Sequence, residues 1–442
     1  MKTLPLIDRA CADPYVAYSY SYPHKSAYGP FQPPVDLKPV WQAERRDALF
    51  LYIHIPFCEM RCGFCNLFTQ ANASADFIQA YLRSLERQAA CMADLLGKAT
   101  FSRFAIGGGT PTVLTSGQLD QVFDFVEKRF ILLPGRVPTS VEVSPQTVSA
   151  ERVRVLRDRG VERVSMGVQS FVDEESHRIG RPQKRRVVEQ ALAFIDGFPI
   201  VNIDLIYGQP EQTLASWEYS LRSALEHEPE ELFLYPLYVR PQTGAARRGN
   251  VQRAQAESTL SMYRLGRDLL TSAGYEQISM RCFRRQGITS EEGPAYCCQR
   301  DGMVGLGAGA RSYTRDLHYS TPFAVEAVGV QKIIANWIGL SDEQQGMAHW
   351  GIRLSDDDRK RRFVIQSLLQ KTGLADEAYR TEFASTVEQD FPILMRWIDQ
   401  GFVIHEWGRW RLSGAGLELS DFLGPALYSQ ARMLELQEFS QC

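Results

Sequence analysis

The sequence predicts an α/β protein: a (β/α)6-type partial TIM barrel with an N-terminal arm and a C-terminal helical, winged-helix-like domain. Short apolar segments alternate with helical patterns from about residue 50 to residue 325, which is typical of parallel βαβ units. Glycine-rich and polar stretches directly follow several of these segments, and barrel chemistry gathers at the C-terminal strand ends. After residue 325 helical patterns replace the alternation. We therefore expect an arm at 1–48, a barrel core at 49–325 and a C-terminal domain at 326–442.

The arm is expected to be extended and packed rather than helical. Its segment PYVAYSYSYPHKSAYGPFQPP holds five tyrosines and five prolines. Prolines disfavour a helix, and the aromatic content argues against disorder. We therefore expect ordered, extended chain before the first barrel strand.

The barrel is expected to start with the apolar strand LFLYIHI, which ends where a cysteine-rich loop begins. Further strands are expected at RFAIGGG, SVEVSP, RVSMGVQS, IVNIDLIYG, LFLYPLYV and YEQISMRCF. Helices are expected at 75–97 and near 117–129, 149–159, 183–196, 213–226 and 251–273. In the first of these, Phe77, Tyr81, Leu85 and Ala89 recur at helical spacing. The stretch GLGAGARS is expected to be the last barrel strand or turn.

The C-terminal domain is expected to contain helices near 327–339, 356–371 and 389–400. The segment GFVIHEWGRWRLSGAGLELSDFLG then predicts a small β-hairpin and a closing helix. Such a wing can bind DNA, but this hairpin offers only Arg409 and Arg411 against Glu406. We therefore expect no nucleic-acid partner.

Composition narrows the class of protein further. The net charge of −3 and the pI near 6.2 give no electrostatic case for nucleic acid or an anionic membrane. No apolar run approaches the roughly 18 residues of a membrane span, and MKTLPLIDRACADPY lacks the core of a secretory signal. Nine cysteines in 442 residues, three of them clustered, do not resemble a disulfide framework. We expect a monomeric, cytoplasmic protein without a membrane partner.

Three cysteines, Cys58, Cys62 and Cys65, form a C-x3-C-x2-C run. A 4Fe–4S cluster normally takes four thiolates. Three close thiolates with no obvious fourth therefore indicate a cluster with one open iron, which S-adenosylmethionine (SAM) can chelate. A zinc half-site and chance remain the alternatives. Structural zinc usually takes two cysteine pairs, which the adjacent Cys297 and Cys298 do not supply, and the first gap is wrong for a ferredoxin.

Polar residues follow several predicted strands. GGGTPT, from Gly107 to Thr112, permits close approach of a ligand to the backbone, although it also suits a tight turn. Glu142, Gln169 and Asp204 lie at or in strand ends, and Arg181 follows shortly after Gln169. Carboxylates suit ribose hydroxyls, and Arg181 suits a carboxylate. Each of them alone could be structural, but together they favour a ligand site.

YIHIPFC, GGGTPT, SMGVQSF, Arg181 and NIDLIYGQPEQT together resemble the coproporphyrinogen-oxidase-like branch of the radical SAM enzymes, called HemN-like. The resemblance runs from about residue 15 to the C-terminal wing. It implies a radical SAM core, a 4Fe–4S cluster and one or two SAM molecules. Reductive cleavage of SAM would yield a 5′-deoxyadenosyl radical, with a flavodoxin or ferredoxin as electron donor and a small molecule as substrate.

The resemblance also implies a set of binding residues. Cys58, Cys62 and Cys65 would hold the cluster. The first SAM would contact Tyr52, Gly108 and Glu142. The second SAM would contact Phe64, Gly109, Thr110, Gln169, Arg181 and Asp204. Tyr238 aligns with a backbone contact to SAM, and Arg311 aligns with an apolar position near the adenosine, where GLGAGARS would close.

Three reactions or roles remain open. The first is methyl transfer, or a related reaction, with a second SAM. The second is oxidative decarboxylation of coproporphyrinogen, favoured by the arm YSYSYPHK but disfavoured by Leu67, which stands where the oxidase has a further cysteine. The third is haem trafficking, but YCCQRDGMVGLGAG lacks the HNxxYW haem motif of that branch. The substrate-binding residues and the role of Cys297 and Cys298 are not predicted.

Overall fold

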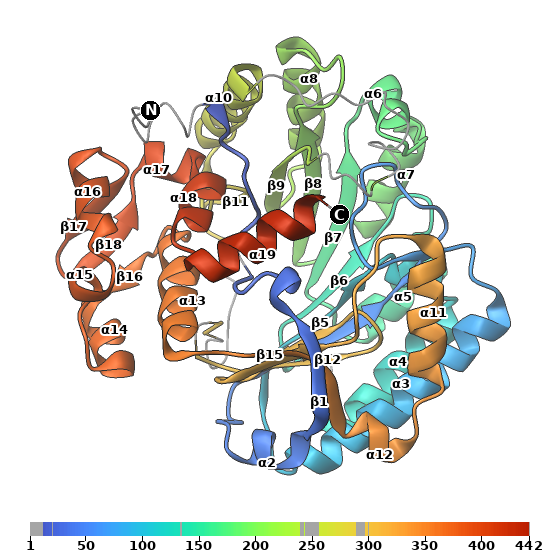
Figure 1. The fold of residues 1–442 in the computed structure, drawn as a ribbon. Helices are drawn as coiled ribbons and strands as arrows, with labels where there is room; N and C mark the ends of the chain where they lie inside the picture. Colours follow the sequence, from blue (N-terminus) through green and yellow to red (C-terminus); the bar gives the residue numbers. More distant parts are fainter. Residues whose placement is uncertain are drawn as a thin grey trace.

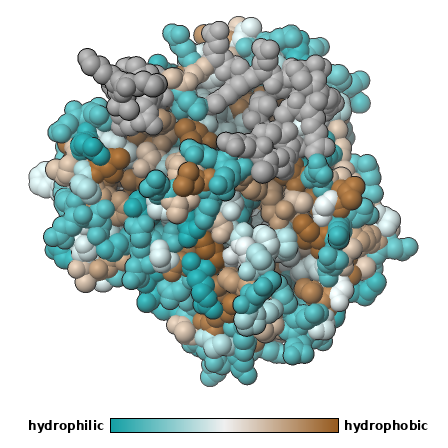
Figure 2. Space-filling view, viewed as in Figure 1, coloured by the Kyte–Doolittle hydropathy of each residue, from teal (hydrophilic) through white to brown (hydrophobic). Residues whose placement is uncertain are grey.

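The computed structural model describes most of the chain (Figure 1). The described residues are 12–19, 21–132, 135–238, Thr243, 256–288, 297–298 and 300–441. Within them, no helix has both the length and the apolar character that crossing a membrane requires. Hydrophilic and hydrophobic side chains are intermixed on the face drawn in Figure 2.

Six parallel strands form the centre of the fold and follow one another in chain order across the sheet. They are β2 (Leu49–Ile55), β5 (Phe101–Gly108), β6 (Thr139–Val143), β7 (Arg163–Gln169), β8 (Ile200–Tyr207) and β9 (Glu231–Pro236). The connecting helices are α3 (Ala75–Leu96), α4 (Ser116–Phe130), α5 (Ala150–Asp158), α6 (Asp173–Arg178), α7 (Arg185–Ile195), α8 (Leu214–Leu225) and α10 (Ala256–Ser272). The predicted βα alternation is confirmed, with α6 unforeseen. Residues 251–255 of the last predicted helix lie outside the described ranges.

Within the described residues the sheet continues beyond this centre as a mixed sheet of thirteen strands, so the barrel is partial. Beside β2 lie β12 (Met303–Leu306), which is parallel to it, and then β13 (Arg311–Tyr313), β14 (Leu317–Ser320), β15 (Met347–Arg353) and β1 (Gly29–Asp36). GLGAGARS therefore forms a strand of the sheet and the turn after it. Gly307 has φ +96°, and a Cβ there would lie 2.3 Å from the Tyr81 hydroxyl, so this turn requires glycine.

The prediction of one strand at YEQISMRCF was wrong. The segment forms two short antiparallel strands, β10 (Tyr275–Gln277) and β11 (Cys282–Arg285), at the far edge of the sheet. Between them the amides of Ile278 and Ser279 both donate to the Cys282 carbonyl, and the Ser279 hydroxyl accepts from the Cys282 amide at 3.2 Å. This serine-stabilised turn reverses the chain.

The arm is packed, as predicted, but it is not extended throughout. Tyr15, Tyr22 and Tyr28 are buried, and β1 pairs with β15. After the short helix η1 (Lys25–Ala27) and β1, however, Leu37–Gln42 forms helix α2, which Asp36 caps by accepting from the Lys38 amide at 2.9 Å. Pro39 lies in the first turn of this helix, where its missing N–H costs little.

The C-terminal part begins with α11 (Ala327–Ile338) and α12 (Asp342–Gln345), which both contact α3. Strand β15 follows and joins the main sheet, which the helical pattern after residue 325 did not predict. Its hydrogen bonds go to β1 and β14, strands remote in sequence, so no local signal marks it. The domain division at residue 325 stays a prediction.

The remaining helices lie at the left of Figure 1, and α19 crosses beside the arm. They are α13 (Asp356–Leu368), α14 (Asp376–Phe383), α15 (Val387–Asp390), α16 (Ile393–Asp399), α17 (Gly414–Glu418), α18 (Ser420–Ala426) and α19 (Gln430–Gln441). The predicted helix at 389–400 is two helices, because Phe391 leaves helical geometry before Pro392. The predicted hairpin is confirmed as β17 (Val403–Glu406) and β18 (Arg409–Leu412). Strand β18 also pairs with β16 (Leu374–Ala375).

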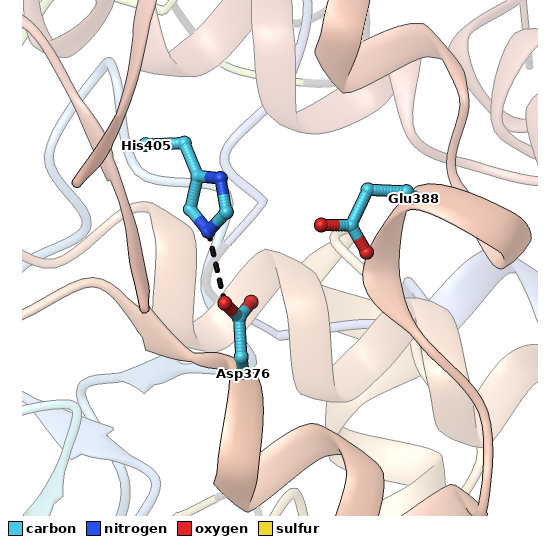
Figure 3. Close-up of side chains that lie close together, drawn as sticks. All are labelled: Asp376, Glu388 and His405. Atoms are coloured by element: carbon cyan, nitrogen blue, oxygen red, sulfur yellow. Dashed lines mark hydrogen bonds and ion pairs between the residues drawn. The ribbon is translucent and has the colours of Figure 1, made fainter. Parts of the chain in front are cut away.

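A polar cluster fixes this wing to the helices (Figure 3). His405 Nε2 lies 2.9 Å from Asp376 Oδ2, and Trp410 Nε1 donates to Asp376 Oδ1 at 2.6 Å. The imidazole stacks on the Trp410 indole with 4.0 Å between ring centroids, and Glu388 faces the pair. These contacts lie close to the hairpin turn, so they hold the wing near its tip rather than leaving it free to swing.

Candidate active site

A cavity of about 540 Å³ opens at the C-terminal ends of the parallel strands. Strands β5 to β9 and the loop after β2 all contribute lining residues, as expected where barrel chemistry gathers. Among the residues predicted from the sequence, the lining includes Cys58, Cys62, Phe64, Cys65, Gly108, Gly109, Thr110, Glu142, Gln169, Arg181, Asp204 and Tyr238. Most of the predicted site is thus brought together in one hollow.

The three clustered cysteines line this cavity on the loop after β2. Short strands β3 (Phe57–Cys58) and β4 (Gln70–Ala71) close the loop on itself. Thr110 Oγ1 donates to the Cys58 sulfur at 3.6 Å, and Arg181 Nη1 donates to the Cys62 sulfur at 3.6 Å. The Cys65 sulfur lies 3.9 Å from Thr69 Oγ1. Hydrogen-bond donors therefore already face the sulfur atoms, as cluster-bound thiolates require.

The spacing of the sulfur atoms bears on which metal group fits. A single tetrahedral zinc ion holds its thiolate sulfurs about 3.8 Å apart, given Zn–S bonds of about 2.3 Å. In the described part of the chain, at least one pair of these three sulfur atoms lies more than 4.8 Å apart. This wider set fits a multi-iron cluster better than one zinc ion.

Burial controls the thiol chemistry. It raises the pKa of Cys58 to about 12, and it also raises the pKa of Cys62, against a smaller lowering by the Arg181 guanidinium. Such thiols stay protonated at neutral pH unless a metal takes the place of the proton. The donor set therefore fits a metal cluster and not a free nucleophilic cysteine.

The glycines of GGGTPT are explained by close packing. The Gly108 amide donates to Glu142 Oε2 at 3.0 Å, and Gly108 has φ +115°. A Cβ on Gly107 would lie 2.9 Å from the Glu142 carboxyl carbon. A Cβ on Gly109 would lie 2.5 Å from the Phe57 carbonyl oxygen. The end of β5 thus packs against both the cysteine loop and Glu142.

We expect Gly109→Ala to lower both the thermal stability of the protein and its iron content after reconstitution. The added Cβ would lie 2.9 Å from the Cys58 sulfur, and overpacking of this kind costs about 1–3 kcal/mol. Iron per chain and the unfolding midpoint measure the effect. Gly117→Ala is the matched control, since a Cβ there meets nothing within 4 Å. Equal iron content in the two variants would contradict this account.

Two carboxyl groups line the cavity: Glu142 is exposed to it and Asp204 is half-buried. Desolvation at this depth raises the pKa of Glu142, and the Gly108 amide partly offsets this effect. Burial also raises the pKa of Asp204 to about 7, with a smaller lowering by the Asn202 amide, which donates to Asp204 Oδ1 at 2.8 Å. A carboxyl poised near neutral pH inside a cavity is typical of a functional site.

Arg181 and Gln169 also line the cavity. Arg181 Nη2 donates to the Gly167 carbonyl at 2.8 Å and to Ser144 Oγ at 3.3 Å, and Nε donates to Gln183 at 3.1 Å. The guanidinium is therefore held in one orientation at the cavity surface. Gln169 has φ +71°, an uncommon backbone conformation for a residue with a side chain, of the kind that gathers at ligand sites.

Tyr52 does not line the cavity in the structure. Its neighbour His54 has Nε2 at 3.0 Å from the Phe68 carbonyl, which can only accept, so Nε2 carries the hydrogen. Burial lowers the pKa of His54 to about 4, so its Nδ1 is an acceptor and the Tyr52 hydroxyl donates to it at 3.2 Å. His54 is a packed structural residue, and Tyr52 as a SAM contact stays a prediction.

Arg311 likewise lies outside the lining, and so do Cys297 and Cys298. Arg311 Nη1 donates to Ser21 Oγ of the arm at 3.2 Å and to the Tyr313 hydroxyl at 3.4 Å. As a SAM contact Arg311 also stays a prediction. The Cys297 amide donates to Asp301 at 2.7 Å, so this pair of cysteines belongs to a separate turn.

Several lining residues were not predicted from the sequence. Glu59 and Arg61 lie between the first two cysteines, and Glu59 Oε2 and Arg61 Nη2 are buried without a hydrogen-bond partner among the described residues. Their place inside the cysteine motif was a usable signal. Tyr18 of the arm also lines the cavity, held 4.3 Å over the Arg281 guanidinium. Only the tertiary fold brings it there.

Comparison with known proteins defines the class. Residues 52–224 match the model of the Radical SAM superfamily. The solved structure of coproporphyrinogen III oxidase (HemN) from Escherichia coli, described as a radical SAM enzyme, superposes with a TM-score of 0.74 and 25% identity. That match covers 91% of this chain and 96% of the other. The fold is that of a radical SAM enzyme.

Relatives in sequence narrow the class to a family. Oxygen-independent coproporphyrinogen III oxidase from Escherichia coli is 30% identical over 378 residues, or 80% of each chain. The same enzyme from Salmonella typhimurium is 30% identical over 416 residues, covering 87% of this chain and 88% of its own. Heme chaperone HemW of Bacillus subtilis is 32% identical over 271 residues, which cover 59% of this chain and 70% of HemW. The chain therefore belongs to the HemN-like family of radical SAM enzymes, which use a 4Fe–4S cluster and SAM.

Proposed function

We propose that this enzyme binds two SAM molecules in the cavity and transfers a methyl group, or carries out a related reaction, on a small organic substrate. One observation carries the proposal: two sets of polar residues, called two walls below, line this one cavity. Glu142 and Gly108 form one wall beside the cysteine loop. Gln169, Arg181 and Asp204 form the other. One SAM molecule does not require both.

The first wall would serve the cluster and the SAM bound to it. Cys58, Cys62 and Cys65 would hold the cluster, and Phe64 would lie beside it. A 4Fe–4S cluster with SAM on its open iron supplies one electron that cleaves the sulfonium to methionine and a 5′-deoxyadenosyl radical. Glu142, already fixed by the Gly108 amide, would accept from the ribose hydroxyls.

The second wall would hold the other SAM. The fixed Arg181 guanidinium suits the methionine carboxylate, because it presents a positive charge and the one Nη1 hydrogen that Cys62 does not use. Asp204 would accept from ribose hydroxyls, and Gln169, Gly109 and Thr110 would complete the wall. A methyl group leaving this SAM would produce S-adenosylhomocysteine.

The pKa of Asp204 gives a test of the second wall. Its pKa is raised to about 7, so the carboxylate that accepts from ribose forms only as the pH rises through 7. We expect the SAM affinity of the wild type, divided by that of Asp204→Asn, to rise about tenfold between about pH 6 and pH 8. Equilibrium dialysis of labelled SAM measures this ratio, and the division cancels titration of SAM itself. A pH-independent ratio would count against a role for Asp204.

Oxidative decarboxylation of coproporphyrinogen is the second candidate. The relatives that span 80–88% of both chains are named as that oxidase, and Tyr18 of the arm reaches the cavity. Against it stands Leu67, which is 53% exposed and lines the cavity where the oxidase has a cysteine. The HemW relative aligns with only 59% of this chain, which makes a haem chaperone the weakest candidate.

Product analysis separates these candidates. The protein would be reconstituted anaerobically and given SAM, dithionite and either coproporphyrinogen III or a candidate methyl acceptor. S-adenosylhomocysteine that depends on the acceptor would support methyl transfer. Loss of coproporphyrinogen without S-adenosylhomocysteine would support decarboxylation, and absence of 5′-deoxyadenosine from a cluster-loaded protein would favour the chaperone. A flavodoxin or ferredoxin donor, a monomeric state, a cytoplasmic location and the absence of a nucleic-acid partner remain predictions.

A further inference from the structure

The polar cluster at the wing, Asp376, Glu388 and His405, brings together three side chains that can ligate a metal (Figure 3). Asp376 is the first residue of α14, Glu388 lies on α15 and His405 lies on β17. One ligand atom from each of them lies within 4.8 Å of the other two. In the described part of the chain, no other set of three His, Cys, Asp or Glu side chains converges this closely. None of the three lines the catalytic cavity, so the cluster is a separate place in the molecule.

Glu388 is the member of the cluster that a simple ion pair does not explain. His405 and Asp376 satisfy each other at 2.9 Å, and the Trp410 indole donates to the second oxygen of Asp376. Glu388 has no hydrogen bond or ion pair among the described residues, yet its carboxylate faces the His405–Asp376 pair (Figure 3). Neither acid is paired with a lysine or arginine in that part of the chain. Two carboxylates this close without a cation repel each other, and a cation between them removes the repulsion.

The kinds of ligand atom restrict which cation fits. One imidazole nitrogen and two carboxylate oxygens carry two negative charges, which balance one divalent ion. Calcium and magnesium favour sets made of oxygen alone, whereas zinc binds histidine nitrogen and carboxylate oxygen together. In a tetrahedral zinc site these atoms lie about 3.3 Å apart, given bonds of about 2.0–2.1 Å, so small side-chain rotations close the set. None of the three side chains is buried, so the ion and a water molecule can reach them.

Asp376 is already held in the orientation that such an ion needs. Its amide donates to the Gly408 carbonyl at 2.9 Å, which fixes its backbone to the hairpin turn. Its Oδ1 accepts from Trp410 Nε1 at 2.6 Å, and its Oδ2 is thereby left facing His405. Metal-binding carboxylates are commonly oriented by an outer hydrogen bond of this kind.

We propose that Asp376, Glu388 and His405 bind one zinc ion, with water as the fourth ligand. The ion takes the place of the hydrogen now lying between His405 Nε2 and Asp376 Oδ2, and the neutral imidazole carries its hydrogen on Nδ1. It joins α14, α15 and β17, so it acts as a structural clip between the wing and the helices. The site does not rest on the reaction proposed for the catalytic cavity.

Zinc binding to two glutamate variants tests the proposal. Cluster-loaded protein, whose cysteine loop is occupied, would be dialysed anaerobically against micromolar zinc and its zinc content measured. We expect one zinc per chain at this site in the wild type, and at least tenfold weaker binding in Glu388→Gln. Glu343→Gln is the matched control, because Glu343 is likewise the second residue of a four-residue capped helix, α12, and should keep the zinc. Equal zinc content in Glu388→Gln and the wild type would overturn the proposal.

The unfolding temperature gives a second readout. Zinc should raise it in the wild type and in Glu343→Gln, because a ligand that binds only the folded state stabilises that state, and should not raise it in Glu388→Gln. Without zinc, Glu388→Gln should be at least as stable as the wild type, because it removes a repulsion and no hydrogen bond. A millimolar excess of magnesium should leave the zinc in place. A zinc-induced rise of the same size in Glu388→Gln, or release of the zinc by magnesium, would overturn the zinc site.

Discussion

Cys62→Ala is expected to abolish reductive cleavage of SAM, with the rate of 5′-deoxyadenosine formation falling at least about 1,000-fold, or about 4 kcal/mol in barrier. The three cysteines that line the cavity are proposed to hold the cluster, so loss of one would leave too few thiolates. Cys62 is also the sulfur that receives the Arg181 hydrogen bond. Chromatography of the anaerobic reaction, with iron and sulfide analysis of the same sample, measures the effect.

Cys91→Ala is the control for this variant. Cys91 lies on α3 and does not line the cavity. Among the described residues, its thiol has a single hydrogen-bond partner, the Asp342 carbonyl at 3.8 Å. It should keep full iron content and full cleavage. Persistent cleavage of SAM in Cys62→Ala, with cleavage in Cys91→Ala unchanged, would contradict the role of the cysteine loop in holding the cluster.

Arg181→Met carries the second large effect. Losing the guanidinium removes the charged partner proposed for the methionine carboxylate, and truncating one side of a buried hydrogen-bonded charge pair costs about 2–5 kcal/mol. We therefore expect the second SAM to bind at least about 30-fold more weakly, since about 1.4 kcal/mol is tenfold. Cleavage of the first SAM should remain within a few-fold, so 5′-deoxyadenosine persists while S-adenosylhomocysteine is lost.

Arg284→Met is the control that tests whether the loss of any arginine has the same effect. Arg284 pairs with Glu231 at 2.8 Å and does not line the cavity. It should lose neither product. Loss of both products together in Arg181→Met would show instead that Arg181 acts on the cluster through its contact with Cys62.

Local sequence patterns were enough for the parallel core and for most of the site. The apolar strands and amphipathic helices carry their own periodicity, and the cysteines lie within eight residues of one another. Glu142, Gln169 and Asp204 converge because parallel strands end at the same edge of a sheet. Their meeting in one cavity follows from topology that the βα alternation already predicted.

Pairings between segments that are remote in the chain could not be predicted from the sequence. Strand β15 depends on hydrogen bonds to β1 and β14 and carries no strong local signal. Tyr18 reaches the cavity through its contact with Arg281 on the far edge of the sheet. The turn at Ser279 likewise depends on packing that the order of residues does not reveal.

The number of SAM molecules bound per chain tests the central claim most directly, and it needs no substrate. Cluster-loaded protein would be dialysed anaerobically against labelled SAM without reductant, so that no SAM is consumed. The account predicts two SAM molecules per chain in the wild type and one in Arg181→Met. One SAM per chain in the wild type would contradict the two-walled cavity as a site for two SAM molecules.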